Sequence, residues 1–502
     1  MIKKIGLEVN EYTDASMVKI GEAGFPAPFK GGLEFASPAR GTWNIVHTGM
    51  LIPEAHEIFV CAASCLRGVV LTAAEMNALD RFSTVEVKEN NLLDGNLEEL
   101  LIDGVSDIID KLDKRPPAVL VYTSCVHHFT GCDWGVMFGT LKERFPDIDI
   151  IDCYMNPTLR KSGLNPDQTM RRQLYALLKA REINPASVAI IGNDLPTKEN
   201  SDLYRILQKH GLKIHEITSC KSYDEYQEMA ESSMYITYYP AAKASGDALA
   251  KRLGGKHIYL PYSWDYDEIQ DFLELLEKEC GNLEAASSDA SYMNLGEVED
   301  KNLASEGSQG IDLSEVRVAE CENAFKETLN LIGDTPIAID YTFCPRPTSV
   351  AKQLLAHGFN VRRIYLDSFT GEEKGDYEYL KGNYPDLELY PTVDVKSRFF
   401  ASGARAIETR GSCNTNCGTN DNLGAAHQDG KTGSVRWLAI GQKAAYFLDT
   451  DYFVNVVEGG GMFGYEAIID TLELMRDAYL NPKDMRRLVQ IKGQGCGSCC
   501  IG

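Results

Sequence analysis

The sequence predicts an α/β protein made of three units, each with a parallel sheet covered on both faces by helices. Short, continuously apolar runs, typical of buried strands, alternate with segments whose apolar residues recur at helical spacings of three and four. The 502 residues are also too many for one ordinary hydrophobic core. We therefore expect several domains of one class.

The first domain is expected over residues 1–160. In 96–112 the leucines and isoleucines fall at helical spacings. Strands are predicted at 57–60, 82–87, 118–124 and 148–155, and helices at 66–82, 96–112 and 134–145. Strands that alternate with helices in this way pair in parallel, so their carboxyl ends meet at one edge of the sheet.

The second domain is expected over residues 161–280. Strands are predicted at 187–193, 213–218, 234–239 and 256–261, and helices at 200–211, 245–255 and 264–280. His210-Gly211 and Gly254-Gly255 are typical helix ends. The following residues, 281–310, are rich in Ser, Gly, Asn and acids, which predicts a linker or mobile surface segment.

The third domain is expected over residues 311–502. Strands are predicted at 336–341, 360–368 and 435–441, and helices at 312–333, 348–358 and 464–479. The domain also contains a cysteine-containing loop, RGSCNTNCGTNDNLG, and a cysteine-rich C-terminal tail, GQGCGSCCIG.

Composition narrows the class of protein. The formal net charge is −23 at pH 7, and an acidic surface repels phosphate backbones, so nucleic acid is not an expected partner. No run of about 18 apolar residues occurs, so we expect no membrane span. The start, MIKKIGLEVNEY, lacks the apolar stretch of a signal peptide. A cytoplasmic location is therefore expected.

Fourteen cysteines are many for such a protein. Without an export signal a disulfide framework is disfavoured, and metal binding or redox chemistry becomes more plausible. Scattered cysteines are mostly small core residues, so the grouped ones matter most. The groups are Cys61 with Cys65, Cys125 with Cys132, Cys413 with Cys417, and Cys496 with Cys499 and Cys500.

Cys61 and Cys125 each follow a predicted strand of the first domain, so both should project from the same edge of one sheet. Cys65 should lie at the start of the next helix, where free amides and the helix dipole favour a thiolate. Iron–sulfur clusters use thiolates of this kind. The alternatives are buried core thiols, a Cys61–Cys65 redox disulfide, and a nucleophilic cysteine paired with His127 or His128.

Three further groups remain open on the residues alone. Asp133 is expected to be a helix N-cap, with carboxylate ligation as the alternative, and Cys132 precedes it. The CxxxC of Cys413 and Cys417 stands in a glycine- and asparagine-rich loop, and the terminal cysteines are either reactive or part of an incidental tail. No GxxxxGK[ST] loop and no dinucleotide fingerprint is present, so we predict neither ATP hydrolysis by this chain nor NAD or FAD.

Several motifs in order resemble component 1 of the nitrogenase superfamily. This family includes the molybdenum–iron protein subunits, dark-operative protochlorophyllide reductase, nickel-sirohydrochlorin reductive cyclase and cofactor-assembly scaffolds. The resemblance begins with a cysteine entering a helix near residue 65 and covers about residues 40–485. The other motifs are VYTSCVHHFTGCDWG, MYITYYPAAKASGDALAKRLGGKHIYLPYSWDYDEIQDFLELL and EGGGMFGYEAIIDTLELMRD.

The resemblance implies three Rossmann-like domains and an iron–sulfur cluster, 4Fe-4S or larger, at a subunit interface. It also implies a homodimer, or a heterotetramer with a related subunit, and a separate ATP-hydrolysing iron–sulfur reductase that supplies low-potential electrons. Cys125 matches the family's cluster ligand best, and Cys65 or Cys61 matches the ligand at the preceding helix. Cys132 or Asp133 would complete the set.

The implied function is a nitrogenase-like oxidoreductase component that reduces an unidentified small molecule. A scaffold for cofactor assembly, without turnover, is the alternative, and a non-enzymatic metal or small-ligand sensor is a third. Where catalytic nitrogenase subunits carry the cysteine that anchors their large cofactor, this chain has Tyr238 and Tyr239, which argues against dinitrogen reduction. Cys413 and Cys417 would bind a second metal centre or line the substrate cavity.

Overall fold

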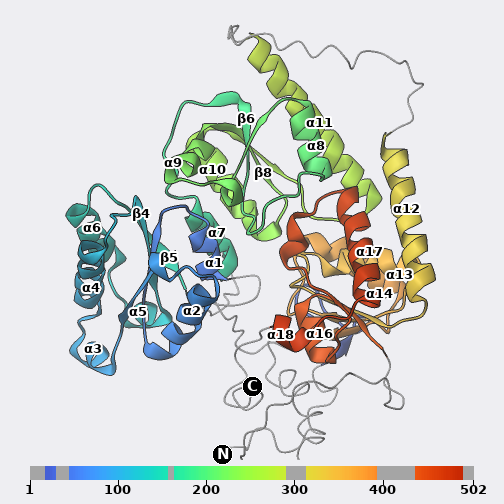
Figure 1. Cartoon of the computed structure of the whole chain (residues 1–502), viewed down its shortest axis with the longest axis horizontal. Coiled ribbons are helices and arrows are strands. Elements are labelled where there is room, and N and C mark those ends of the chain that lie inside the picture. The colour runs from blue at the N-terminus through green and yellow to red at the C-terminus, as the bar shows by residue number, and fades with distance from the viewer. Residues whose placement is uncertain (1–16, 30–43, 156–162, 290–312, 393–435, 490–502) are drawn as a thin grey trace, which may run out of the picture. The chain divides into compact units, whose positions relative to one another are not determined.

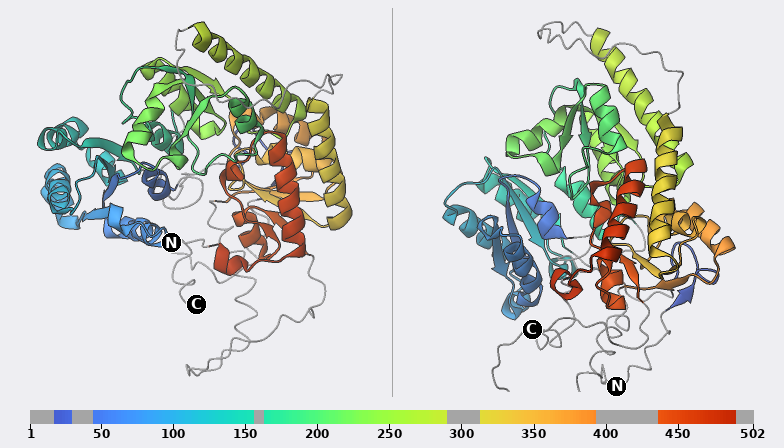
Figure 2. Two further views of the ribbon diagram at one scale, coloured as in Figure 1. Left: turned by 45° about the horizontal axis from the view of Figure 1, so that its top comes forward. Right: turned by 45° about the vertical axis from the view of Figure 1, so that its right-hand side comes forward.

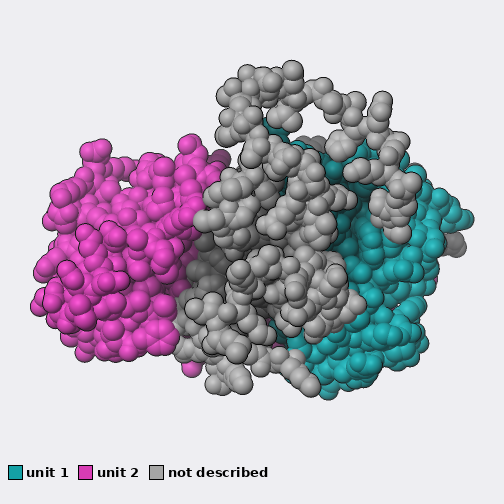
Figure 3. Space-filling view, turned by 90° about the horizontal axis from the view of Figure 1, so that it is seen from below, with its two compact units in different colours: residues 1–31, 320–457, 469–502 teal, residues 32–319, 458–468 magenta. Residues whose placement is uncertain are grey.

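The computed structural model describes residues 17–29, 44–155, 163–289, 313–392 and 436–489 (Figure 1). The chain divides into two compact units, coloured separately in Figure 3. Unit 1 comprises residues 1–31, 320–457 and 469–502, and unit 2 comprises residues 32–319 and 458–468. No helix among the described residues is long and apolar enough to cross a membrane.

The first sheet of unit 2 is fully parallel, with the strand order β3-β2-β4-β5. The strands are β2 (His56–Cys61), β3 (Phe82–Glu86), β4 (Ala118–Thr123) and β5 (Asp149–Tyr154). The helices are α1 (Ile45–Met50), α2 (Ala63–Glu75), α3 (Glu89–Asp94), α4 (Leu97–Lys111), α5 (Cys125–Thr130) and α6 (Trp134–Arg144). These elements confirm the predicted alternation, and the sequence pattern missed only the short helices α1, α3 and α5.

Helices cover both faces of this sheet, as Figures 1 and 2 show. Because successive side chains of a strand point to opposite faces, Phe59 and Cys61 of β2 join the core beneath α1 and α2, whereas Ile58 and Val60 join the core beneath α4 and α6. Burial on both faces explains why the strand sequences are continuously apolar.

The second sheet of unit 2 is also parallel and has the order β7-β6-β8-β9. The strands are β6 (Asn184–Ile190), β7 (Lys213–Glu216), β8 (Ser232–Thr237) and β9 (Lys256–Tyr259). The helices are α7 (Pro166–Leu174), α8 (Asp202–Lys209), α9 (Tyr223–Glu228), α10 (Lys243–Leu253) and α11 (Tyr266–Asp289). Gly254 ends α10 in the left-handed conformation at φ +89°, which confirms the predicted helix end.

Helix α11 differs from the prediction at its C-terminal end. It continues to Asp289, so its last nine residues occupy the start of the segment expected to be a linker. The sequence 282–287, NLEAAS, contains no proline or glycine and includes good helix formers, so nothing stops the helix there. The rest of the expected linker, from 290 on, lies outside the described residues.

The sheet of unit 1 has six strands in the order β1-β12-β11-β10-β13-β14. They are β1 (Val18–Lys19), β10 (Ile337–Asp340), β11 (Val361–Tyr365), β12 (Glu388–Tyr390), β13 (Leu438–Ile440) and β14 (Phe453–Val454). The helices are α13 (Pro347–Ala356), α14 (Lys374–Asn383), α16 (Gln442–Leu448) and α18 (Met485–Leu488), while α12 (Leu313–Ile332) and α17 (Tyr465–Leu480) begin in unit 2 and end in unit 1. This is the third parallel sheet that the sequence predicts.

Strand β1 is the exception in this sheet. It pairs antiparallel with β12, Val18 opposite Leu389, and so joins unit 1 rather than the first domain, in which the sequence placed residues 1–160. A two-residue strand carries too little periodicity to reveal its partner.

Candidate functional site

Cys61 and Cys125 lie at adjacent strand ends of the first sheet. Strands β2 and β4 pair in parallel with Val60 opposite Thr123, so the chain leaves both strands at the same edge. Cys61 is the last residue of β2 and Cys125 the first residue of α5, separated from β4 only by Ser124. The prediction that both cysteines share one sheet edge is confirmed.

Cys65 is the third residue of α2, directly after β2, and its side chain is exposed. Ala62 precedes the helix in an extended conformation and offers no side-chain cap, so the first amides of α2 keep no side-chain partner from it. Burial raises the pKa of the Cys61 thiol strongly, and negative charge on Cys65 and Cys125 raises it further. The three sulfur groups therefore lie within electrostatic range of one another.

Cys125 has the most mixed surroundings of the three. Burial and the charge of Cys65 raise the pKa of its thiol, whereas the backbone amides of Cys125 and Val126 donate to the sulfur and lower it. Amide hydrogen bonds to sulfur at a helix start are the surroundings that stabilise a thiolate bound to a metal.

His127 is fully buried two residues after Cys125. Its Nδ1 accepts a hydrogen bond from the Ser124 amide at 3.3 Å, so the ring proton resides on Nε2. That Nε2 is buried and has no partner among the described residues. Burial also lowers the pKa of His127. An unpaired donor of this kind is costly unless a group outside the described chain accepts from it. No described hydrogen bond pairs His127 with a cysteine, as a nucleophilic site would require.

Cys132 and Asp133 follow α5 and begin α6. The Asp133 carboxylate accepts from the Val136 amide at 3.1 Å and so caps α6, which confirms the N-cap prediction. The Cys132 sulfur lies 3.3 Å from the Thr130 hydroxyl, and its side chain packs against the core of the first sheet. Cys132 is half-buried and remains a candidate ligand.

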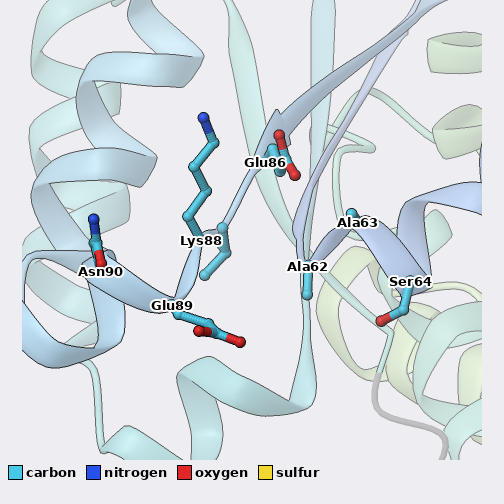
Figure 4. A pocket seen from close by; sticks show the side chains of 8 residues that line it. Ala62, Ala63, Ser64, Glu86, Lys88, Glu89 and Asn90 are labelled. Carbon is cyan, nitrogen blue, oxygen red and sulfur yellow. The ribbon is translucent and has the colours of Figure 1, made fainter.

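An open pocket of about 480 Å³ lies at the start of α2 (Figure 4). One wall is the start of α2, Ala62 to Ser64, and the other is the connection from β3 to α3, Glu86 to Asn90. Lys88, Glu86 and Glu89 make its lining polar and charged. The hollow is thus lined by residues that stand next to Cys61 and Cys65 in the chain.

The remaining cysteines contribute less to this site. Cys153, Cys280, Cys321 and Cys344 are buried, and Cys220 is half-buried, as expected of core thiols. Cys413 and Cys417, together with Cys496, Cys499 and Cys500, lie outside the described residues. Among the residues that are described, no three His, Cys, Asp or Glu side chains converge closely enough to hold a single metal ion.

The three grouped thiols nevertheless fit an iron–sulfur cluster, because its thiolates bind different iron atoms and need not converge on one point. Cys61, Cys65 and Cys125 supply soft sulfur ligands, and amides already point at one of them. The unpartnered His127 Nε2–H stands two residues away. The arrangement suits a redox-active group held at the sheet edge.

The corresponding edge of the second sheet carries polar residues that the sequence analysis missed. Asn193, which follows β6, donates to Glu216 at 2.8 Å and to the Tyr238 hydroxyl at 2.8 Å. The Arg171 guanidinium lies over the Tyr239 ring, 4.5 Å from its centroid, and bonds to Asp194. The signal was the position of Asn193 and Asp194 at the end of the predicted strand 187–193, because strand ends form the binding edge of such sheets.

Comparisons with known proteins agree with this architecture. The sequence model of the nitrogenase component 1 type oxidoreductase family matches residues 48–309, just over half of the chain. The solved structure of nitrogenase Cp1 at pH 6.5 superposes with a TM-score of 0.57 at 11% identity, over 90% of this chain and 94% of that chain. The structure of nitrogenase Cp1 at pH 5 gives 0.53 and 10%, over 95% and 96%. No curated protein matches the sequence.

Proposed function

Because the chain belongs to the nitrogenase component 1 type oxidoreductase family, we propose that it is an iron–sulfur reductase component. In this proposal it accepts low-potential electrons from a separate ATP-hydrolysing reductase and passes them to an unidentified small molecule. The predicted Rossmann-like α/β fold is present in all three sheets, and the structural neighbours share it.

One observation carries the proposal: Cys61 and Cys65 come together with Cys125, which is distant in sequence, at one edge of the first sheet. Three core thiols would have no reason to gather there, with one exposed and one half-buried. The unpartnered His127 donor, two residues after Cys125 in the chain, supports a bound group that is electron-rich.

The proposed ligands differ in burial and in the backbone amides that act on their sulfur atoms. Metal binding needs thiolates, so a raised thiol pKa opposes it. Cys61 is fully buried with a strongly raised pKa, whereas Cys125 receives two amide hydrogen bonds and Cys65 is exposed at a helix start. Cys65 and Cys125 therefore act as the primary ligands and Cys61 as the third, and Cys132 is proposed to complete the set.

The bound cluster would supply reversible one-electron transfer at a potential set by its surroundings. The chain contributes the burial around Cys61 and the amides at Cys125, both of which tune that potential. Cys413 and Cys417 are proposed to hold a second metal centre or to line the substrate cavity.

The partners follow from charge and from the family. The net charge of −23 suits a reductase that presents a basic docking face. A homodimer, or a heterotetramer with a related subunit, would place a second copy of the thiols opposite the first. The exposed side chains of Leu93, Phe129 and Val136, at 83%, 80% and 51%, lie on α3, α5 and α6 of the first sheet's domain and suit a protein partner.

The alternative is an assembly scaffold that holds a cluster and transfers it without turnover. The exposure of Cys65 favours this alternative, because an accessible ligand allows exchange with an acceptor protein. The buried Tyr238 and Tyr239, which stand where the sequence comparison expected a cofactor-anchoring cysteine, favour it as well.

Anaerobic purification followed by iron and sulfide analysis and electron paramagnetic resonance tests the common premise. We expect stoichiometric iron and sulfide and a cluster signal on reduction; a protein free of both would contradict both functions. Reoxidation of the reduced cluster by substrate, in the presence of an ATP-dependent reductase, would support the reductase. Transfer of iron and sulfide to an acceptor protein without turnover would support the scaffold.

A further inference from the structure

A buried ionic network lies at the carboxyl edge of the second sheet. Arg171, on α7, is 1% exposed and bonds through Nε to Asp167 at 2.7 Å. Its two terminal nitrogens bond to Asp194 at 2.7 and 2.9 Å, and Nη2 lies 3.9 Å from Glu458. Three carboxyl groups thus surround one guanidinium, and the Tyr239 ring covers it on one face.

A proton kept by one carboxyl group halves the charge imbalance of this network. Three carboxylates around one arginine would leave two uncompensated negative charges in a buried place, which is very costly. Asp194 and Glu458 are hydrogen-bonded to each other, and two carboxyl groups can share such a bond only through a proton. Asp194 has the bidentate contact with Arg171, so it is the ionised partner and Glu458 is the acid.

Glu458 also stands at a special point of the backbone. The chain returns to unit 2 at Glu458 and leaves it after Ile468. Glu458 has φ +52°, a left-handed conformation that costs a residue with a side chain free energy, and the next three glycines are left-handed too. A strained residue at the entry to a segment needs a compensating contact, and the hydrogen bond to Asp194 supplies one.

The rest of the segment 458–468 is held by backbone contacts and packing. The Lys198 amide donates to the Gly461 carbonyl at 2.9 Å, and the Asp202 carboxylate accepts from the Tyr465 amide at 2.7 Å. Phe463 belongs to the core of the second sheet. Glu458 is therefore one of several anchors of this segment, and the one whose contact depends on a proton.

We propose that the Glu458 proton is a latch for the segment 458–468: protonated Glu458, hydrogen-bonded to Asp194, holds the segment in unit 2, and loss of the proton loosens it. Ionised Glu458 would face Asp194 and Asp167 as like charges, with only the more distant contact to Arg171 in compensation. This inference stands independently of the proposed function.

The groups that face Glu458 fix the direction of the pH dependence. Burial and the charges of Asp194 and Asp167 raise the pKa of Glu458 well above its usual range, and Arg171 opposes them. Tyr239 also faces it, and His47 of α1 acts on Asp194. Once the segment opens, Glu458 regains an ordinary pKa of about 4.3 and releases its proton above that pH. The segment is thus held most firmly at low pH and loosens as the pH rises towards the folded-state pKa.

Hydrogen exchange by mass spectrometry on the full chain tests the latch between pH 5.5 and 8. If opening of the segment releases one proton, its opening equilibrium constant increases tenfold for each unit by which the pH rises. After correction for intrinsic exchange, we expect the peptide over 458–468 to show this tenfold rise in the wild type. Glu458→Gln keeps the shape of the side chain and a donor towards Asp194 but cannot ionise. The tenfold rise in exchange per pH unit should therefore be absent from the peptide over 458–468 in this variant.

Glu373→Gln is the matched control, since Glu373 is a buried carboxyl of unit 1 whose pKa burial raises to about 7. It should leave the slope of 458–468 as in the wild type. Equal slopes in Glu458→Gln and the wild type, or loss of the slope in Glu373→Gln, would overturn the latch. The wild type alone gives a second test: if the peptides over 458–468 and β8 have equal slopes, the latch is refuted whether or not Glu458→Gln folds.

Discussion

The two sheets of unit 2 share one topology, but the side chains at their carboxyl edges differ in chemistry. In β3-β2-β4-β5 and in β7-β6-β8-β9, the first strand in the chain lies between the second and the third. The switch point, where ligands bind in such folds, therefore falls between β2 and β4 and between β6 and β8. At the first switch point stand Cys61 and Cys125, and at the second stand Asp194 and Tyr239. The topology determines where a ligand site can form, and the side chains at that position determine its chemistry.

The edges differ in whether charged groups are paired within the chain. At the second edge, Arg171 reaches two carboxylates and the Gly192 carbonyl, all buried together. At the first edge, the His127 Nε2 has no described partner and Cys65 is exposed. The charged groups of the second edge are thus paired within the chain, although the buried Asn193 Oδ1 there has no described partner, whereas the first edge holds a buried unpartnered donor and an exposed thiol. Four predictions test this contrast, from the largest expected effect to the smallest.

Replacing the thiols at the first edge should remove the bound iron. We expect Cys125→Ala and Cys65→Ala to lose most of the bound iron, because backbone amides act on the Cys125 sulfur and Cys65 is exposed at a helix start. Cys61→Ala should lose less, since burial keeps the pKa of that thiol high. Iron and sulfide per chain after anaerobic purification are the readout. Cys280→Ala, in the core of the second sheet, is the control and should keep its iron. Unchanged iron in all three variants would leave the first edge without its assigned ligand.

Removing the Arg171 cation at the second edge should lower the unfolding free energy. Arg171→Met leaves Asp167 and Asp194 buried without their partner, and loss of one member of a buried ion pair costs about 3–5 kcal/mol of unfolding free energy. The cost should shrink at low pH, because Asp167, whose pKa burial raises to about 6, then takes up a proton. Denaturant unfolding followed through unit 2 measures it.

Arg115→Met is the matched control for this variant. Arg115 forms a comparable two-bond contact with Asp147, but both side chains are exposed, so its loss should leave the unfolding free energy near that of the wild type. If the two variants unfolded alike, burial would not be what distinguishes the second edge.

The contrast also explains what the sequence could predict. The strands around Cys61 and Cys125 were recognisable because continuous apolar runs end at each cysteine, and parallel pairing then places both at one edge. The second edge was not recognisable, because Arg171 lies on α7, a helix the pattern missed, and Glu458 comes from 264 positions after Asp194 in the chain. Contacts between segments so distant leave no periodic trace. The antiparallel β1 was missed for the same reason.

Acid should weaken the first sheet and leave the latch of the second intact. His56, at the start of β2, lies 2.8 Å from the Ser83 hydroxyl, and burial, with the charge of Arg81, lowers its pKa to about 4. A histidine with a depressed folded-state pKa contributes stability above about pH 6.5 that is lost as the pH falls towards 4. We expect His56→Gln to remove this loss, as measured by hydrogen exchange over β2 and β3. Peptides over β6 and β8 are the internal reference; an equal change there would mean that His56 does not act on the first sheet specifically.

The smallest effect is expected at Phe129, on the exposed surface one helical turn after Cys125. Its side chain is 80% exposed, so Phe129→Ser should change the unfolding free energy of the chain by no more than about 0.5 kcal/mol. Phe463, 3% exposed at the second edge, is the counterpart, and Phe463→Ala should cost about 3–5 kcal/mol. Unfolding at low protein concentration compares the two. A cost of several kcal/mol for Phe129→Ser would mean that another surface covers the first edge in solution. In that case, the two edges would differ in what covers them rather than in whether they are covered.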